Sequence, residues 1–149
     1  MSLVNKSNMI REYEDKDLAE LLDAWYSASM VAHPFLSEEF FEQERENIVS
    51  IHLPNAETWV YELDGIVIGF IALIENEVGA IFLDPKFHGR GIGRALMDHA
   101  RNQRSELELD VFKENVIGRN FYKKYGFKEE YEHLHKEYGF MQLRLKLIC

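Results

Sequence analysis

A glycine-rich turn between an apolar segment and a helical segment constrains the fold more than any other feature. The apolar run 78–83 predicts a buried strand, and apolar side chains then recur at helical spacing as far as Arg104. Between them, Gly89, Gly91 and Gly93 allow backbone conformations that other residues rarely adopt. The first amides of the following helix lack partners within it and face the positive end of its dipole. The element therefore predicts an anion site, for which a pyrophosphate is the natural ligand.

The spacing of these glycines separates three kinds of phosphate-binding turn. The P-loop pattern, Gly-x-x-x-x-Gly-Lys-Ser/Thr, does not occur in the chain. The Rossmann pattern lacks its third glycine, because Gly93 is followed by Arg94-Ala95-Leu96. What remains is Gln/Arg-x-x-Gly-x-Gly/Ala, which residues 88–93 satisfy except at the first position, His88. This pattern resembles the coenzyme A pyrophosphate loop of the GNAT superfamily of N-acyltransferases, and an ordinary surface turn is the alternative.

Length and composition bound the class of protein. The chain has 149 residues, enough for one domain with a substantial core, and 46% of them are hydrophobic, which predicts a globular fold. No apolar run approaches the roughly 20 residues that span a bilayer, and the first residues do not resemble a signal peptide. The lone cysteine, Cys149, excludes an internal disulfide and a cysteine-rich zinc site. We therefore expect one cytoplasmic domain over residues 1–149, with residues 1–8 as an extended tail, no metal and no membrane association.

The net charge of −9 is divided unevenly along the chain. Residues 1–79 carry 16 acidic and 4 basic side chains, whereas residues 80–149 carry 10 acidic and 13 basic ones. Two differently charged halves could attract a polyphosphate cofactor and a cationic substrate separately. The alternative is that the acids merely form solvated helix faces. Under either interpretation the overall charge disfavours nucleic acid as a partner.

The periodicity along the chain predicts alternating blocks of helices and strands. Helix signals follow Asp15 or Asp17 and again follow Ser37, and the second helix is expected to end before Pro54. Asp64-Gly65 predicts a hairpin turn, and Gly126 a helix C-terminus. The strands are expected at 9–13, 58–63, 66–74, 78–83, 107–112, 127–135 and 138–147, with later helices ending near 104 and 125. No internal repeat or linker interrupts this order.

A second motif makes the resemblance specific. Residues 115–127 are similar to the GNAT pattern Asn-x-x-Ala-x-x-Phe/Leu-Tyr-x-x-x-Gly-Phe, with Gly118 in place of the usual alanine. Both motifs occur in the expected order and context, so the chain is identified as a member of the superfamily, and segments around Ala32–Leu36 further resemble YjaB-type bacterial acetyltransferases. The resemblance implies an α+β fold (α/β three-layer type). Its central sheet would be mixed and mostly antiparallel, with helices on both faces.

The resemblance also implies where acetyl-CoA binds. Strands 78–83 and 107–112 would separate near their ends and admit the acyl-pantetheine arm. Asn115 would bond the pantetheine, and Tyr122 would stand beside the sulfur. Backbone groups of strand 78–83, at Ile81, Phe82 and Leu83, would hydrogen-bond the pantetheine arm. The phosphate loop would supply His88, Gly89, Arg90, Gly91, Ile92, Gly93 and Arg94.

The chemistry of acyl transfer to an amine suggests roles for several side chains. A tyrosine stays protonated at neutral pH and can protonate the departing thiolate, so Tyr122 is the expected acid, with Tyr125 a weaker substitute. The base that deprotonates the amine is ranked Asp110, then Glu77, then His33, and water alone could suffice. By resemblance, the acceptor pocket is expected to include Trp25, Tyr26, His33, Phe35 and Trp59.

Three functions remain open at this point. The first is an acetyl-CoA-dependent N-acetyltransferase that acts on an amine of a small molecule or of a peptide or protein, as a monomer or homodimer. The second is an acyl-CoA-binding sensor that keeps the cofactor site without turnover. The third is a toxin-type acetyltransferase acting on charged tRNA, which the acidic charge disfavours. The presence of both Asn115 and Tyr122 favours the first.

Overall fold

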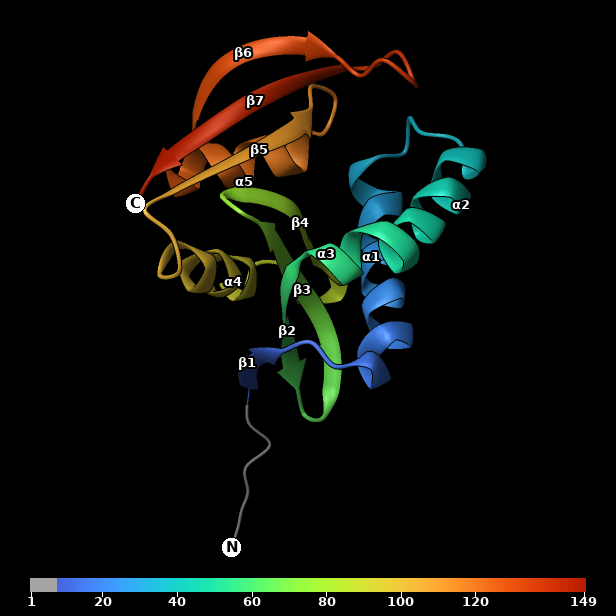
Figure 1. Cartoon of the computed structure of the whole chain (residues 1–149), viewed down its shortest axis with the longest axis vertical. Coiled ribbons are helices and arrows are strands. Elements are labelled where there is room, and N and C mark those ends of the chain that lie inside the picture. The colour runs from blue at the N-terminus through green and yellow to red at the C-terminus, as the bar shows by residue number, and fades with distance from the viewer. Residues whose placement is uncertain (1–7) are drawn as a thin grey trace, which may run out of the picture.

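The computed structural model describes residues 8–149 and contains one seven-stranded sheet with the strand order β1-β2-β3-β4-β5-β7-β6 (Figure 1). The strands are β1 (Asn8–Glu12), β2 (Glu57–Leu63), β3 (Ile66–Ile74), β4 (Glu77–Leu83), β5 (Glu106–Phe112), β6 (Lys128–Leu134) and β7 (Met141–Ile148). The longer helices are α1 (Leu18–Ala32), α2 (Glu38–Asn47), α4 (Ile92–Arg101) and α5 (Val116–Tyr125). Of the expected tail over residues 1–8, only Asn8 falls within the described residues, and it belongs to β1.

The pairing of β4 with β5 is the feature that creates a site. These two strands run parallel, and their ladder holds the single pair Glu77–Glu108, next to a hydrogen bond of 2.9 Å from the Glu108 amide to the Asn76 carbonyl. The other neighbouring strands pair antiparallel over most of their length. Beyond Glu77, β4 and β5 therefore separate, and the backbone groups that would have joined them face an opening. The mixed, mostly antiparallel sheet confirms the predicted fold class.

Helices cover both faces of the sheet and bury two separate cores. On one face, α4 packs on β3 and β4, and its Leu96 and Met97 are fully buried. On the other face, α1 packs on β3 and β4 and buries Leu21 and Trp25 against Phe70. The continuous burial of β3 follows from this double cover, since a strand covered on both faces is apolar at nearly every position.

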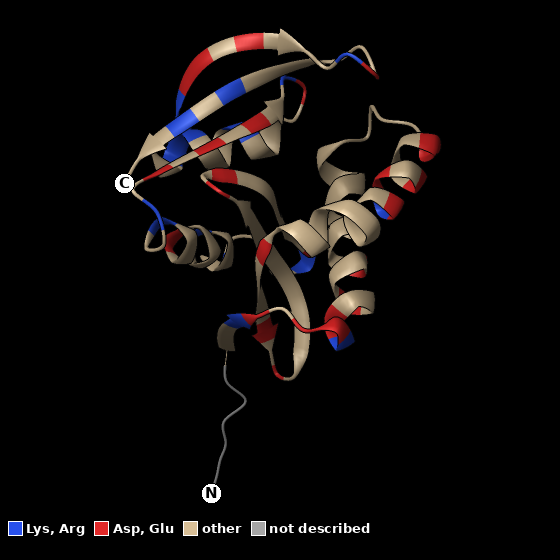
Figure 2. Cartoon of the chain, viewed as in Figure 1, with Lys and Arg blue, Asp and Glu red and all other residues tan. Residues whose placement is uncertain are grey.

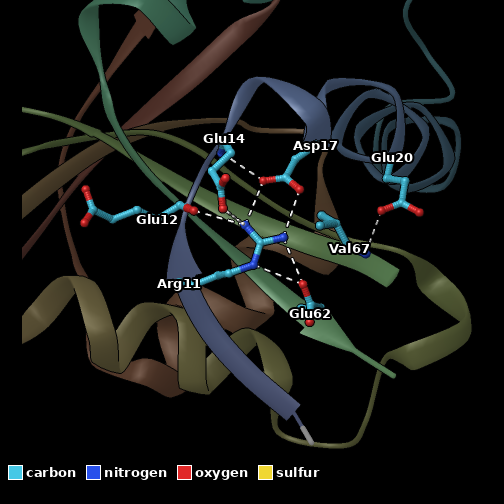
Figure 3. Close-up of polar contacts among 7 residues, drawn as sticks. All are labelled: Arg11, Glu12, Glu14, Asp17, Glu20, Glu62 and Val67. Carbon is cyan, nitrogen blue, oxygen red and sulfur yellow. Dashed lines mark hydrogen bonds and ion pairs between the residues drawn. The ribbon is translucent and has the colours of Figure 1, made fainter. Parts of the chain in front are cut away.

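An ion-pair cluster anchors the N-terminal strand to the entry of α1 (Figure 3). The Arg11 guanidinium donates to both carboxylate oxygens of Asp17 at 2.8 and 2.9 Å, and to Glu62 on β2. Asp17 is only 3% exposed and also accepts from the Glu14 amide. Asp17 is the N-cap residue of α1, as predicted, but its side chain makes no hydrogen bond to the first turn of that helix. The Asp17 carboxylate is instead used by Arg11, which lowers its pKa.

The second helix begins as predicted but ends later. The Ser37 hydroxyl accepts from the Phe40 amide and caps α2. The predicted stop before Pro54 is wrong, because α2 continues into a π-helical turn, η2 (Ile48–His52), and then into α3 (Leu53–Asn55). Pro54 lies in the first turn of α3, where its missing N–H costs no hydrogen bond. Within residues 8–149, no helix is both long and apolar enough to cross a membrane.

Candidate functional site

A cavity of about 980 Å³ occupies the region where β4 and β5 separate. Its walls come from α1, α2, both strands, the loop before α4, and α5. Most of the residues expected from the sequence line this one cavity. They are Trp25, His33, Glu77, Ile81, Phe82, Leu83, His88, Gly89, Gly91, Ile92, Gly93, Arg94, Asp110, Asn115 and Tyr122. Four expected residues, Tyr26, Phe35, Trp59 and Arg90, lie outside the lining.

The glycine-rich loop lies at one end of the cavity, directly before α4. Gly89 and Gly91 both have φ of +80°, a conformation that favours glycine. Gly91 is the N-terminal cap of α4, so the free amides of the first helical turn open toward the cavity. His88 Nε2 donates to the Leu83 carbonyl at 3.2 Å and ties the loop to the end of β4. The Arg90 guanidinium stacks 5.3 Å from the Phe87 ring. The loop can therefore hold an anion with backbone donors.

Asn115 and His33 meet across the cavity wall. Asn115 caps α5, since its side-chain oxygen accepts from the Gly118 amide at 2.9 Å. Its nitrogen lies 3.1 Å from His33 Nε2, at the end of α1. Because the amide nitrogen can only donate, Nε2 is the acceptor and the ring proton is on Nδ1. Burial lowers the pKa of His33 to about 4, so the imidazole is neutral at pH 7.

The two tyrosines of α5 differ in their hydrogen bonding. Tyr122 lines the cavity and packs against Phe121 and Phe127, and burial raises its pKa above the ordinary value of 10. Among the described residues, no group hydrogen-bonds the Tyr122 hydroxyl. The Tyr125 hydroxyl donates to Asp98 on α4, and burial together with this bond raises its pKa to about 12. The two hydroxyls thus differ, since that of Tyr125 is bonded to Asp98 whereas that of Tyr122 has no partner among the described residues.

Arg144 on β7 holds both carboxylates that the sequence placed in the role of base. It makes two hydrogen bonds to Glu77, of 2.8 and 2.6 Å, and lies 3.4 Å from Asp110. Asp110 also contacts His133 Nε2 at 2.9 Å. Arg144 thus links β7 to β4 across β5. This link lies beside Glu77–Glu108, the pair in the ladder of the parallel strands β4 and β5. Such paired carboxylates have fewer free lone pairs for an incoming amine.

The aromatic residues expected around the acceptor are divided among different surroundings. Trp25 lines the cavity, and Tyr26 is exposed beside it, with the Arg45 guanidinium stacked on both rings. Phe35 packs on Phe140 and Phe112, behind the cavity wall. Trp59 lies on the other face of the sheet, where its ring centroid is 4.9 Å from that of His99 on α4. The structure therefore separates Trp59 from the cavity.

Several lining residues have no motif in the sequence that would reveal them. Glu44 and His52 come from α2 and its π-helical extension, and His135 and Gln142 come from the hairpin of β6 and β7. The tip of that hairpin reaches α2, where the ring centroids of Tyr138 and Phe40 are 4.6 Å apart. The only signal in the sequence was the apolar side of the second helix, and this does not indicate which residues face a cavity. Among residues 8–149, no group of three potential ligands is arranged to hold a metal ion.

Comparison with known proteins places the chain in a family. The family model described as "Acetyltransferase (GNAT) domain" matches residues 54–129. The peptidyl-lysine N-acetyltransferase YjaB of Escherichia coli (strain K12) is 36% identical over 140 residues, covering 90% of this chain and 94% of YjaB. The peptidyl-lysine N-acetyltransferase YiaC of the same strain is 34% identical over 120 residues, covering 80% of this chain and 82% of YiaC.

Solved structures agree with the sequence relatives. The solution structure of apo-form YjaB from Escherichia coli superposes with a TM-score of 0.82 at 30% identity, covering 94% of this chain and 97% of YjaB. The PaiA N-acetyltransferase of Thermoplasma acidophilum, solved in complex with coenzyme A, has a TM-score of 0.71 at 24% identity, covering 95% of this chain and 99% of PaiA. With the family model, the relatives and the split sheet in agreement, the chain belongs to the GNAT family of acetyltransferases.

Proposed function

We propose that this chain transfers the acetyl group of acetyl-CoA to an amine, and that the side-chain amine of a peptide or protein lysine is its acceptor. One observation carries the proposal. The glycine-rich loop before α4 and Tyr122 line the same cavity, between parallel strands that have separated. The acceptor class is supported by the names of YjaB and YiaC, both peptidyl-lysine N-acetyltransferases. A cytoplasmic location fits the lone, exposed Cys149.

The cofactor would lie along the opening with its pyrophosphate on the loop. The amides from Gly89 to Arg94 are the donors for the phosphates, and His88 and Arg94 stand beside them. The backbone of Ile81–Leu83, which lacks a partner on β5 in the described ladder, is available to the pantetheine arm. These residues fit the cofactor because they combine a phosphate site with unpaired strand groups in one cavity.

In the reaction, acetyl-CoA supplies an activated carbonyl that an unprotonated amine attacks. Tyr122 gives its proton to the departing thiolate sulfur. Burial favours this role, because it raises the pKa of the phenol and keeps it protonated at neutral pH. A backbone amide of β4 stabilises the negative charge that develops on the carbonyl oxygen. Together these groups supply an acid and an oxyanion donor without a covalent enzyme intermediate.

Asn115 connects cofactor binding to the proposed base. In the structure its amide nitrogen donates a hydrogen bond to Nε2 of His33, so this ring nitrogen has no free lone pair. If the same amide turns to bond the pantetheine, Nε2 becomes free to take a proton from the amine, directly or through water. Because Arg144 holds Glu77 and Asp110, our proposal places His33 first among the three candidate bases, as a weak base whose pKa is lowered to about 4 by burial. The enzyme would then acquire its base only when the cofactor is bound.

The proposal is tested by measuring CoA release from acetyl-CoA with a lysine-containing peptide, with the acetylated product located by mass spectrometry. We expect acetylation of the lysine side chain. Thermal stabilisation by CoA, but much less by a pantetheine fragment without phosphate, would support the loop assignment. Stabilisation by CoA with no product from any amine would reject the enzyme and favour the acyl-CoA-binding sensor.

A further inference from the structure

Three carboxylates line the cavity, and their partners differ. Glu77 and Asp110, on β4 and β5, are both held by Arg144. Glu44, on α2, receives one hydrogen bond of 3.3 Å from the side-chain nitrogen of Asn47 on its own helix. Within the described part of the chain, no lysine, arginine or histidine lies within ion-pair distance of Glu44. Glu44 is therefore the lining carboxylate whose charge the protein leaves uncompensated.

The position of Glu44 on its helix distinguishes it from the other acids of α2. Glu42 and Glu46 are exposed on the outer side, whereas Glu44 is half-buried. Phe40 and Ile48, one turn before and one turn after it, are buried and line the same cavity. A carboxylate that is partly removed from water in apolar surroundings has a desolvation cost, which an incoming cation would offset.

The arrangement of the helices indicates which cation this is. α2 lies on the outer side of α1, whereas α5, which carries Tyr122, lies across the opening on the other side (Figure 1). Acidic residues are frequent along α2, while α5 carries two lysines and one arginine (Figure 2). An amine held by a carboxylate also stays protonated and cannot attack a carbonyl. Glu44 is thus suited to a charge that does not react.

We propose that Glu44 binds a second positive charge on the acceptor, so that the enzyme selects acceptors with a cationic group near the reacting amine. For a peptide acceptor, this means a lysine followed or preceded within a few residues by another basic side chain. This inference rests on the proposed acetyltransferase function and adds a specificity determinant to it. It also gives a location to the cationic preference that the charge division of the sequence suggested.

The test compares blocked peptides that contain one lysine. In one peptide the lysine is surrounded by alanine, and in the others an arginine stands one to three positions away, because arginine adds charge but is not an acetyl acceptor. For the wild-type enzyme we expect KM to be roughly tenfold lower for the best arginine-containing peptide. Glu44→Gln should remove this difference by raising the KM of the arginine-containing peptides toward that of the alanine peptide. Glu42→Gln, an exposed neighbour outside the cavity, is the matched control and should keep the difference.

A binding measurement separates failure of this inference from failure of the proposed function. Calorimetric titration of the same peptides into the enzyme–CoA complex should show the same Glu44-dependent difference in Kd, whether or not turnover occurs. If neither peptide is acetylated but the difference in binding persists, the proposed reaction is wrong and the Glu44 site stands. If Glu44→Gln and Glu42→Gln behave alike in both measurements, the inference is overturned.

Discussion

The side-chain nitrogen of Asn115 lies 3.1 Å from Nε2 of His33, and this contact joins the start of α5 to the end of α1. The arrangement depends on Gly118, because a Cβ there would lie 2.6 Å from the same nitrogen. The superfamily pattern has alanine at this position. The contact between the two helices is therefore linked to a departure of this chain from the usual motif.

Replacing Asn115 with Asp tests the direction of this hydrogen bond. A carboxylate still accepts from the Gly118 amide and caps α5, but it presents a negative oxygen to His33 in place of a donor. We expect the pKa of His33 to rise by about 1–3 units from its value of about 4, because the charge favours the imidazolium. An NMR titration of the imidazole measures this shift.

Asn115→Ala is the control for that experiment. It removes the cap, at about 1 kcal/mol of stability, and brings no charge to His33. The pKa of His33 in this variant should then stay far below its pKa in the Asn115→Asp variant. An unchanged pKa in Asn115→Asp would mean that the two side chains do not meet in solution.

Stability should depend on pH through two partly buried histidines. Burial lowers the folded-state pKa of His33 to about 4 and also lowers that of His99, whose Nε2 is buried without a partner among the described residues. The unfolded chain therefore binds more protons as the pH falls from about 6.5 toward 4. The stability present above pH 6.5 is lost across that window, by up to about 3 kcal/mol for His33.

Urea unfolding at a series of pH values measures this loss. His33→Phe should remove most of it, because a phenyl ring keeps the edge contacts with Phe35 and Phe112 but does not titrate. The remaining slope should fall further when His99→Phe is added. An unaltered slope in His33→Phe would show that His33 is accessible to protons in the folded protein.

The phosphate loop makes a prediction about backbone conformation. Gly91→Val places a β-branched residue at φ +80°, where valine is strained, so the loop should rearrange and lose its amide donors. We expect the thermal stabilisation by CoA to disappear. Gly65→Val provides the control, because it has a similar φ of +84° in the β2–β3 turn, outside the cavity lining, and should keep the stabilisation. If both variants lose CoA binding, the cause is general destabilisation of the protein and not a change in the phosphate loop.

Local patterns in the sequence were sufficient to predict most of the fold. Asp64-Gly65 forms the hairpin turn with both residues at positive φ, and Gly126 ends α5, as their residue types indicate. The local patterns did not reveal how the Asp17 carboxylate is bonded or where the second helix ends. The Asp17 side chain is used by Arg11, and Pro54 is accommodated by a π-helical turn before it.

In the candidate site, too, local motifs revealed some residues, whereas others depend on how distant elements pack. The loop and the α5 motif are continuous in sequence, so their residues could be named in advance, and they line one cavity. Arg144 could not be foreseen, because its role depends on the register of β7 beside β5, which places it next to Asp110. Glu44 could not be distinguished from the other acids of its helix until the neighbouring elements showed which side faces the cavity.

The assignment of Tyr122 as the acid gives the most specific prediction. Tyr122→Phe removes only the hydroxyl, which has no hydrogen-bond partner among the described residues, so packing against Phe121 and Phe127 should persist. If the hydroxyl protonates the thiolate, kcat should fall by about 10²–10⁴-fold while KM stays nearly constant, because the lost interaction belongs to the transition state. Steady-state kinetics of CoA release with the best lysine peptide measures both constants.

Tyr125→Phe separates this role from a general effect of removing a phenol from α5. The Tyr125 hydroxyl is bonded to Asp98, so its loss should lower stability slightly and leave kcat within a few-fold of wild type. The stabilisation by CoA should be the same in Tyr122→Phe and in the wild-type protein, which shows that the site is intact. Near-normal turnover in Tyr122→Phe, with CoA still bound, would transfer the acid role to water, because the bonded Tyr125 hydroxyl lacks a free proton to give.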